Sequence, residues 1–361
     1  MDNDISKFYV GCDVSDKTIA ICIMDNDGKI VKEGTAPSEP SDVIEYLKAS
    51  NVQFTRIGFE AGGIAIWLCR RLLEEGYPAI CIETHKASVF LSAQKMKTDK
   101  NDARGIAQMM RCGLYSAVHI KSDESQRLKM LINNRRFLVE QRVDIENQIR
   151  GTLKVFGLKI GAVTEKQYEA RVRELIQADG ELEVSLIPLL EQRCSGVECI
   201  KTLDKVLMTA VKHDPVCQLL MTAPGVGFLT AILYKAVIDD PTRFRRSKDV
   251  PAQLGLVPRK YASGEVDYNG RITKAGDTML RHHLYKAAEV LTQKNARPCE
   301  LKNWGRSLRK RSSYKGSTIA VARKLSMILH RMWMDGSAFQ WEECMPADKV
   351  DGLKVKQLQA A

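Results

Sequence analysis

The sequence has no long uncharged apolar run, no closely paired cysteines and no leader-like start. A membrane-spanning helix needs roughly 18 apolar residues without charge, and the longest apolar stretches here contain Arg or Lys. The ten cysteines are scattered without a C-x-x-C pair, which argues against a zinc site or a disulfide framework and favours reduced thiols. The segment Met1-Asp2-Asn3-Asp4 lacks the basic and apolar regions of a signal peptide. We therefore expect a cytoplasmic protein with no membrane partner.

The chain does contain enough apolar sequence for a core, and its charge is unevenly distributed. Of its 361 residues, 44% are hydrophobic and 27% are charged, which excludes a disordered or collagen-like protein and suits two or three domains. Residues 1–110 carry a net charge of −3, whereas residues 241–335 carry +14, more than the +11 of the whole chain. This concentrated basic excess predicts a polyanionic partner, with nucleic acid as the first candidate.

The first hundred residues alternate between strand-like and helix-like patterns. Apolar runs and turn residues predict strands at 8–14, 18–24, 29–36, 53–59 and 79–83, and helices at 41–49 (with Ser41 as N-cap), 64–75 and 99–111. Three antiparallel strands followed by helix–strand–helix–strand–helix is the order of the ribonuclease H-like α/β fold. Because that fold carries several chemistries, function has to be argued from the site.

Long helices are expected from about residue 122 onward. Apolar residues at spacings of three, four and seven predict a helix over 122–156, roughly 50 Å long, and a second helix covers 181–212 with Pro188 kinking or delaying it. Their interrupted apolar seam predicts an antiparallel coiled-coil arm for self-association, and the alternative is a helical hairpin packed on its own domain.

The remainder is interpreted as an all-α domain followed by a tail. Helices are predicted at 215–223, 227–238, 247–254, 276–294, 298–312 and 315–334. The predicted division is an α/β domain (1–118), the arm (119–212), the helical domain (213–335) and the tail (336–361).

Four carboxylates are predicted to converge at one edge of the sheet. Asp13 ends the first strand and Glu60 ends the fourth, and these strands are neighbours in a ribonuclease H-like sheet. Asp99 and Asp102 are three residues apart at the start of a helix, so they share one helical face. Singly, each acid has a structural alternative: Asp13 as a turn cap, Asp99 as a helix N-cap, Glu60 as a solvated strand end. Jointly, their placement favours a functional site.

Four converging negative charges repel one another, and divalent cations relieve that repulsion. Hard oxygen ligands suit Mg²⁺, and two metal ions about 4 Å apart can activate the attacking oxygen and stabilise the leaving oxygen of a phosphodiester. Sugar kinases and actin-like ATPases share the opening strand–Asp–strand pattern, but they need Gly/Ser/Thr-rich phosphate loops in two related halves. The segment after Asp13 is Val14-Ser15-Asp16-Lys17 and no second half repeats it, which argues against that class.

The basic half contains a glycine turn between two predicted helices. Gly225 and Gly227 in Pro224-Gly225-Val226-Gly227 resemble the turn of a helix-hairpin-helix, which holds a DNA backbone through its N–H groups without reading sequence. The alternative is a plain structural turn. A basic cluster that would neutralise phosphates follows it, made of Arg243, Arg245, Arg246 and Lys248.

Ser263 is a candidate nucleophile. It precedes Gly264 in a segment without clear helix or strand periodicity, so its hydroxyl is expected to be exposed. Arg271, Lys274 and Arg281 could neutralise a phosphate near it, which the hydroxyl would attack to form a phosphoserine. From chemistry alone, a turn-forming serine is the alternative.

Two further groups of residues in the basic half each have two possible roles. His282 and His283 are candidates for proton transfer or for phosphate contact. A later basic run, which includes Arg309, Lys310 and Arg311 with Trp304 and Tyr314 nearby, is either a phosphate-binding surface or a solvated face.

These motifs together resemble the DEDD transposases of bacterial insertion sequences, family one hundred and ten, to which the pilin-gene invertase Piv is related. The matching stretches are Gly11-Cys12-Asp13-Val14-Ser15, Phe59-Glu60-Ala61-Gly62-Gly63, Lys97-Thr98-Asp99-Lys100-Asn101-Asp102-Ala103, Pro224-Gly225-Val226-Gly227, and the run from Gly255 to Arg281. The resemblance extends over nearly all of residues 8–335. The chain departs from the family beside the carboxylates, with Asp16 before Lys17 and with Gly62 where the family often has threonine.

The resemblance implies a RuvC-like domain, a coiled-coil arm and a transposase domain that carries a nucleophilic serine. It assigns Asp13, Glu60, Asp99 and Asp102 to metal binding and Ser263 to nucleophilic attack. It also implies double-stranded donor and target DNA, a noncoding bridge RNA as guide, and a dimer of dimers in a bacterial cytoplasm, in which one subunit's serine completes another's acidic site.

The sequence therefore predicts a Mg²⁺-dependent, serine-using DNA recombinase of an insertion sequence. A Holliday-junction nuclease or hydrolytic transposase that uses metal-bound water is the second hypothesis. A non-catalytic nucleic-acid-binding protein with a degenerate nuclease fold is the third.

Overall fold

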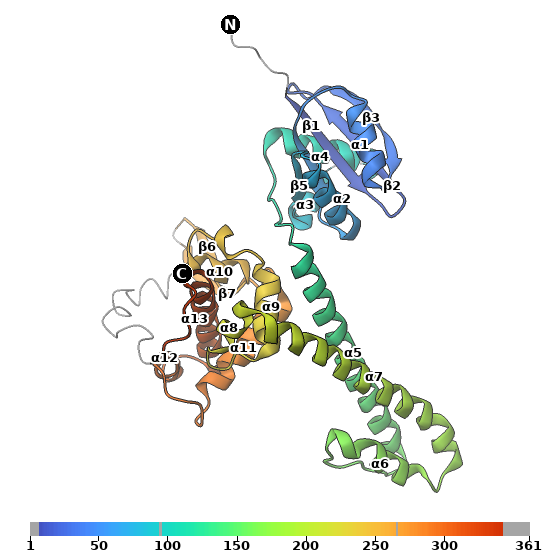
Figure 1. Cartoon of the computed structure of the whole chain (residues 1–361), viewed down its shortest axis with the longest axis vertical. Coiled ribbons are helices and arrows are strands. Elements are labelled where there is room, and N and C mark those ends of the chain that lie inside the picture. The colour runs from blue at the N-terminus through green and yellow to red at the C-terminus, as the bar shows by residue number, and fades with distance from the viewer. Residues whose placement is uncertain (1–6, 94–95, 265, 342–361) are drawn as a thin grey trace. The chain divides into compact units, whose positions relative to one another are not determined.

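The computed structural model describes residues 7–93, 96–264 and 266–341, and the chain divides into two compact units, Met1–Lys121 and Ser122–Ala361. Figure 1 shows the strands of the first unit and the many helices of the second. Of the predicted tail, residues 342–361 lie outside the described part of the chain. Among the helices that are described, none combines the length and apolar character needed to cross a membrane.

The first unit is built on a five-stranded mixed sheet (Figure 1). An antiparallel meander of three strands is extended by two parallel strands, in the order β3-β2-β1-β4-β5. The strands are β1 (Phe8–Val14), β2 (Thr18–Met24), β3 (Ile30–Pro37), β4 (Phe54–Glu60) and β5 (Ala79–Ile82). All five predicted strands are confirmed, and the mixed sheet is that of a ribonuclease H-like domain.

Helices cover both faces of this sheet. α1 (Pro40–Lys48) and α2 (Gly63–Glu74) pack on one face, and α4 (Asp99–Cys112) packs on the other. The predicted N-cap Ser41 is wrong, because the helix begins one residue earlier at Pro40, whose fixed φ suits a first helical turn, and Glu39 is the cap. α3 (Thr84–Leu91) was not predicted, since it buries only Ala87 and therefore has a weak apolar period.

The second unit begins with two long helices that pack against each other. α5 (Asp123–Val155) and α7 (Gly180–His213) are joined by ion pairs, Arg135 with Asp204 and Arg193 with Glu146 at 2.9 Å. α7 continues through Pro188 as one helix. The unpredicted α6 (Glu165–Ile176) shares an apolar cluster with the ends of both long helices. Coiled-coil packing of this pair stays a prediction.

A helical core occupies most of the remaining chain. Its helices are α8 (Pro215–Met221), α9 (Phe228–Ile238), α10 (Val250–Gln253), α11 (Thr278–Thr292), α12 (Glu300–Arg309) and α13 (Tyr314–Asp335), with short 3-10 turns at Pro241–Arg243 and Ser247–Asp249. α9 is apolar around most of its circumference and lies in the centre of the core. The buried Tyr234 hydroxyl donates a hydrogen bond of 2.7 Å to the Ser326 carbonyl, so α9 and α13 are also joined by a polar contact.

The prediction of an all-α C-terminal domain is wrong at one place. β6 (Pro258–Ser263) and β7 (Val266–Ile272) form a two-stranded antiparallel hairpin. The sequence did not indicate these strands because nearly every residue on both is exposed, so no buried face imposes the two-residue alternation by which strands are recognised. The segment around Ser263 is therefore an exposed β-ribbon.

Candidate functional site

The two strand-borne carboxylates lie at matching ends of neighbouring parallel strands. In the β1–β4 pairing, Cys12 is opposite Phe59, so Asp13 and Glu60 are the next residues along their strands. Side chains alternate across a sheet, and Cys12 and Phe59 are buried on the α1–α2 side. Asp13 and Glu60 therefore belong to the opposite face, which α4 covers.

α4 brings the other two carboxylates to this face. Asp99 and Asp102 are in its first turn, and Asp102 is buried. The N-cap is Thr98, whose hydroxyl accepts a hydrogen bond of 3.2 Å from the Asn101 amide, so the alternative role of Asp99 as N-cap does not apply. The positive end of the helix dipole favours carboxylates in this turn.

The carboxylates of this face influence one another electrostatically. The pKa of Asp13 is raised from 3.8 to about 6, first by burial and then by repulsion from Asp102, Asp99 and Glu60. Burial, followed by repulsion from Asp102, also raises the pKa of Glu60. Lys97 opposes both shifts, and sequence reasoning had not singled it out, although it opens the same motif. The cluster therefore carries more negative charge than its surroundings neutralise.

The donor chemistry of this cluster fits a divalent cation, but its side chains are not drawn together as ligands. All four groups are carboxylates, the hard oxygen donors that Mg²⁺ and similar ions prefer. Within the described part of the chain, however, no three His, Cys, Asp or Glu side chains are close enough to hold one ion together. A shared ion would require these side chains to approach one another further.

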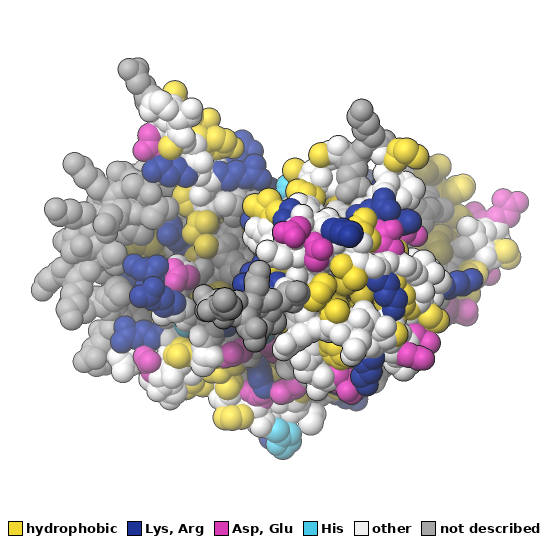
Figure 2. Space-filling view, turned by 90° about the horizontal axis from the view of Figure 1, so that it is seen from above, with side chains coloured by type: hydrophobic (Ala, Val, Ile, Leu, Met, Phe, Trp, Pro, Cys, Tyr) yellow, Lys and Arg dark blue, Asp and Glu magenta, His cyan; other side chains and the backbone are white. Residues whose placement is uncertain are grey.

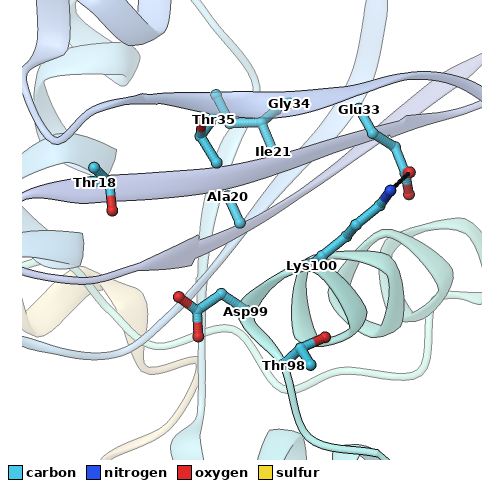
Figure 3. Close-up of a pocket in the computed structure, with 9 residues that line it drawn as sticks. All are labelled: Thr18, Ala20, Ile21, Glu33, Gly34, Thr35, Thr98, Asp99 and Lys100. Carbon is cyan, nitrogen blue, oxygen red and sulfur yellow. Dashed lines mark ion pairs between the residues drawn. The ribbon is translucent and has the colours of Figure 1, made fainter.

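A pocket adjoins Asp99 (Figure 3). It has a volume of about 460 Å³ and lies between β2, β3 and the start of α4. Figure 3 shows Asp99 beneath Ala20, while Lys100 reaches Glu33 in an ion pair of 3.0 Å. Arg104 also forms an ion pair with Glu33, and its hydrogen bond is the main cause that lowers the pKa of this carboxyl to about 2. Glu33 is therefore ionised and already paired with Lys100 and Arg104.

In protein stripped of divalent cations, we expect the stability of the first unit to fall as pH rises from 4 to above 6. Between the unfolded pKa of 3.8 and the folded pKa of about 6, folded Asp13 holds a proton that the unfolded chain has released. Its stabilising contribution is thus complete below the lower value and lost above the upper one. Asp13→Asn removes this titration and should stabilise the protein at pH 7.5 by about 1 kcal/mol, since solvent screens a partly buried group.

Urea unfolding in EDTA at pH 5.0 and 7.5 measures this effect. Asp16→Asn is the matched control, because Asp16 is an exposed acid in the turn that follows β1. An Asp13→Asn protein with the same pH slope as the wild type would contradict the prediction.

The predicted glycine turn lies between α8 and α9. A Cβ at Gly225 would overlap the Ala287 carbonyl group, with the carbonyl carbon at 3.0 Å, so this glycine is required for packing against α11. Gly227 is exposed, is the N-cap of α9, and has open space around its Cα. Gly227, at the start of α9, is the more exposed of the two glycines.

The predicted basic residues divide into two groups by their contacts. Three are engaged with the protein: Arg243 lies over the Phe244 ring, Arg281 donates to the Leu254 and Ala275 carbonyls, and Arg309 donates to Thr292 and lies over Tyr314. The exposed ones are Arg245, Arg246 (paired with Asp249), Lys248, Arg271, Lys274, Lys310 and Arg311. In Figure 2, exposed Lys and Arg side chains gather in groups on the face in view. The exposed basic residues are the ones that a phosphate group can reach.

Ser263 is the last residue of β6 and lies opposite Val266 at the turn of the hairpin. It is exposed, as the sequence predicted. His282 is also exposed, whereas burial lowers the pKa of His283, whose Nδ1 is 3.4 Å from the Thr230 hydroxyl. Both histidines line a pocket of about 380 Å³ that also contains Arg135 and Arg136, and Ser263 is not among its lining residues.

Comparison with known proteins identifies the family. The transposase model DEDD_Tnp_IS110 matches residues 10–157, and the model of the IS116/IS110/IS902 transposase family matches residues 217–302. The chain is 27% identical to the IS1111A transposase of Coxiella burnetii (89% of this chain, 88% of the relative) and 26% identical to the IS1328 transposase of Yersinia enterocolitica (78% and 85%). It is 30% identical to y4pF/y4sB, a candidate transposase of Sinorhizobium fredii (80% and 75%). The chain therefore belongs to the IS110 family of insertion-sequence transposases, enzymes that act on DNA.

Proposed function

We propose that this transposase exchanges DNA strands through a covalent phosphoserine at Ser263, with Mg²⁺ held by Asp13, Glu60, Asp99 and Asp102. The Ser263 oxygen attacks the scissile phosphorus and loses its proton, the bond to the leaving oxygen breaks, and that oxygen takes up a proton. In the second step a strand-end hydroxyl attacks the same phosphorus and the serine is restored. One phosphodiester bond is broken and one is formed, so the exchange needs no external energy source.

The exposed position of Ser263 at the turn of the β6–β7 hairpin carries this proposal. A nucleophilic hydroxyl has to reach a phosphodiester in a bulky duplex, and a ribbon tip outside the hydrophobic core can do so without unfolding. Exposed basic side chains on the same hairpin and the following loop, Arg271 and Lys274, can neutralise the phosphate oxygens.

The carboxylates supply the second part of the proposed site. A bound Mg²⁺ would polarise the phosphate and stabilise the leaving oxygen. The raised pKa of Asp13 supports this assignment, because a carboxylate that is partly buried and also repelled by neighbouring acids gains more from a bound cation than an isolated, solvated one. Lys97, which acts on the same acids, is placed to balance their charge while no cation is bound.

The nucleic-acid partners and the assembly are proposed from the family and the charge. The exposed basic residues of the second unit would hold donor and target DNA, and a noncoding bridge RNA would select them. The division into an α/β domain (1–118), a coiled-coil arm (119–212) and a transposase domain (213–335), assembled as a dimer of dimers, stays part of this proposal. Sequencing the RNA that copurifies with the protein tests the guide, and a random sample of cellular transcripts would count against it.

Trapping the covalent intermediate tests the central step. A donor duplex nicked beside the cleavage site loses its short leaving strand, so the reverse reaction cannot remove the protein from the DNA. We expect a denaturation-resistant adduct whose digested peptide carries the nucleotide on Ser263. Cleavage without an adduct would instead favour the hydrolytic route, in which the four carboxylates suffice and water attacks.

A further inference from the structure

Two tyrosines share a face of the β6–β7 hairpin with Ser263. In the hairpin register, Tyr261 is opposite Tyr268 and Ser263 is opposite Val266. Cross-strand partners lie on the same side of a sheet, and residues two apart on a strand share that side. The opposite side carries other pairs, including Lys260 with Asn269. The serine hydroxyl and both tyrosine rings therefore emerge from one face.

The rings form a stacked pair that is open to solvent. Their centroids are 5.0 Å apart and their planes differ by 19°. Tyr261 is 45% exposed and Tyr268 is 55% exposed, and neither is part of an apolar cluster among the described residues. A Cβ at Gly270 would lie 2.8 Å from the Tyr261 ring, so the glycine leaves room for that ring against the ribbon. The Tyr261 ring thus packs against the ribbon backbone at Gly270, and Tyr268 is the more solvent-exposed of the two rings.

The charge around this pair suits a nucleic-acid strand. Residues 258–274 contain four Lys or Arg and two Asp or Glu, so the segment has an excess of positive charge. An isolated two-stranded ribbon gains little stability from its own exposed face. Aromatic rings beside basic side chains form a stacking platform for bases, and this stacking tolerates any sequence because every base has a π-face.

We propose that Tyr268, supported by Tyr261, stacks on the base of a DNA nucleotide within two positions of the phosphate that Ser263 attacks. This inference rests on the proposed serine route. Tyr268 is the diagonal cross-strand neighbour of Ser263. Such neighbours are roughly 7 Å apart, and this distance is about two base steps of a stacked strand. The ring is therefore at the right distance to hold the flanking nucleotide in place while the phosphate reaches the hydroxyl. Tyr268 acts as a binding and positioning residue.

A fluorescent base tests the contact separately from the chemistry. A donor duplex with 2-aminopurine at each of the two positions on either side of the cleavage site is bound to full-length Ser263→Ala protein. Stacking should lower the fluorescence at one of these positions. The drop should persist with Tyr268→Phe, disappear with Tyr268→Leu, and be unaffected by Asn269→Ala on the opposite face of the same strand. Unchanged fluorescence at all four positions would overturn the proposal.

Cleavage kinetics with otherwise wild-type protein give the second readout. Tyr268→Leu should lower the cleavage rate about tenfold, as expected for one lost base–aromatic stack. An abasic nucleotide at the responsive position should cause the same loss in the wild type and no further loss in Tyr268→Leu. Additive losses would show that ring and base do not interact. A fluorescence drop together with full cleavage by Ser263→Ala would refute the serine route and leave the stacking contact standing.

Discussion

Ser263→Ala is expected to lower strand exchange by at least about a thousandfold, because the substitution removes the proposed attacking oxygen. The side chain is exposed and lies at the end of β6, so its loss leaves no cavity and breaks no packing. The pairing with Val266 runs through backbone groups, which alanine retains. Folding and DNA affinity should therefore stay close to those of the wild type. Strand-exchange assays on supercoiled donor DNA, together with a DNA-binding titration, measure both quantities.

Ser312→Ala is the matched control for this substitution. Ser312 is another exposed serine in the basic half, and it lies between α12 and α13 with no proposed part in the chemistry. It should leave strand exchange unchanged. If Ser263→Ala kept exchange within tenfold of the wild type, the serine would be a turn residue, and water attack at the carboxylates would become the better explanation.

The sheet and its acids were predictable because burial leaves a clear pattern. Strands such as Phe8–Val14 and Thr18–Met24 are apolar runs bounded by turn residues, and they were located to the residue. Once the strand order is given, Asp13 and Glu60 must end neighbouring parallel strands. At this edge the sequence did not decide which residue is the N-cap of α4. The choice between Thr98 and Asp99 depends on a side-chain rotamer rather than on composition.

The β6–β7 hairpin could not be predicted from hydrophobic periodicity. The β6–β7 ribbon is held by cross-strand pairing and by the Tyr261–Tyr268 stack, and neither face is covered by the core of its unit. Hydrophobic periodicity detects burial, so an exposed ribbon leaves no such signal. Tyr261 and Tyr268 are seven residues apart in the sequence, and only the hairpin register makes them neighbours. The residues nearest to the proposed nucleophile were therefore the hardest to identify.

Gly11→Ala is expected to destabilise the first unit by about 3 kcal/mol, at the upper end for an overpacked core position. Gly11 is in the middle of β1, where α4 lies directly on the strand. An added methyl group would overlap the Ala103 carbonyl oxygen and the Ala107 nitrogen, and it would lie 2.9 Å from the Ile106 carbonyl carbon. These are backbone atoms of a helix, so they cannot rotate away as a side chain could, and α4 has to lift from the sheet.

Hydrogen exchange of the full-length protein measures this effect where it arises. Amides of β1 and α4 should exchange about a hundredfold faster in Gly11→Ala than in the wild type. Gly63→Ala is the control within the same unit, because nothing lies within 4 Å of a Cβ at Gly63, and its exchange should stay close to that of the wild type. Equal protection in Gly11→Ala would mean that α4 does not rest on β1 as described.

The same contact links stability to the site. β1 carries Asp13 and α4 carries Asp99 and Asp102, so the distance between strand and helix sets the spacing of the proposed metal ligands. Glycine at position 11 allows the closest approach of the two backbones, which buries Asp13 and brings it nearer to the acids of α4, and both effects raise the pKa of Asp13, burial the more. Gly11→Ala should then lower DNA cleavage even in the fraction that remains folded, and excess Mg²⁺ should restore part of it by drawing the separated carboxylates together.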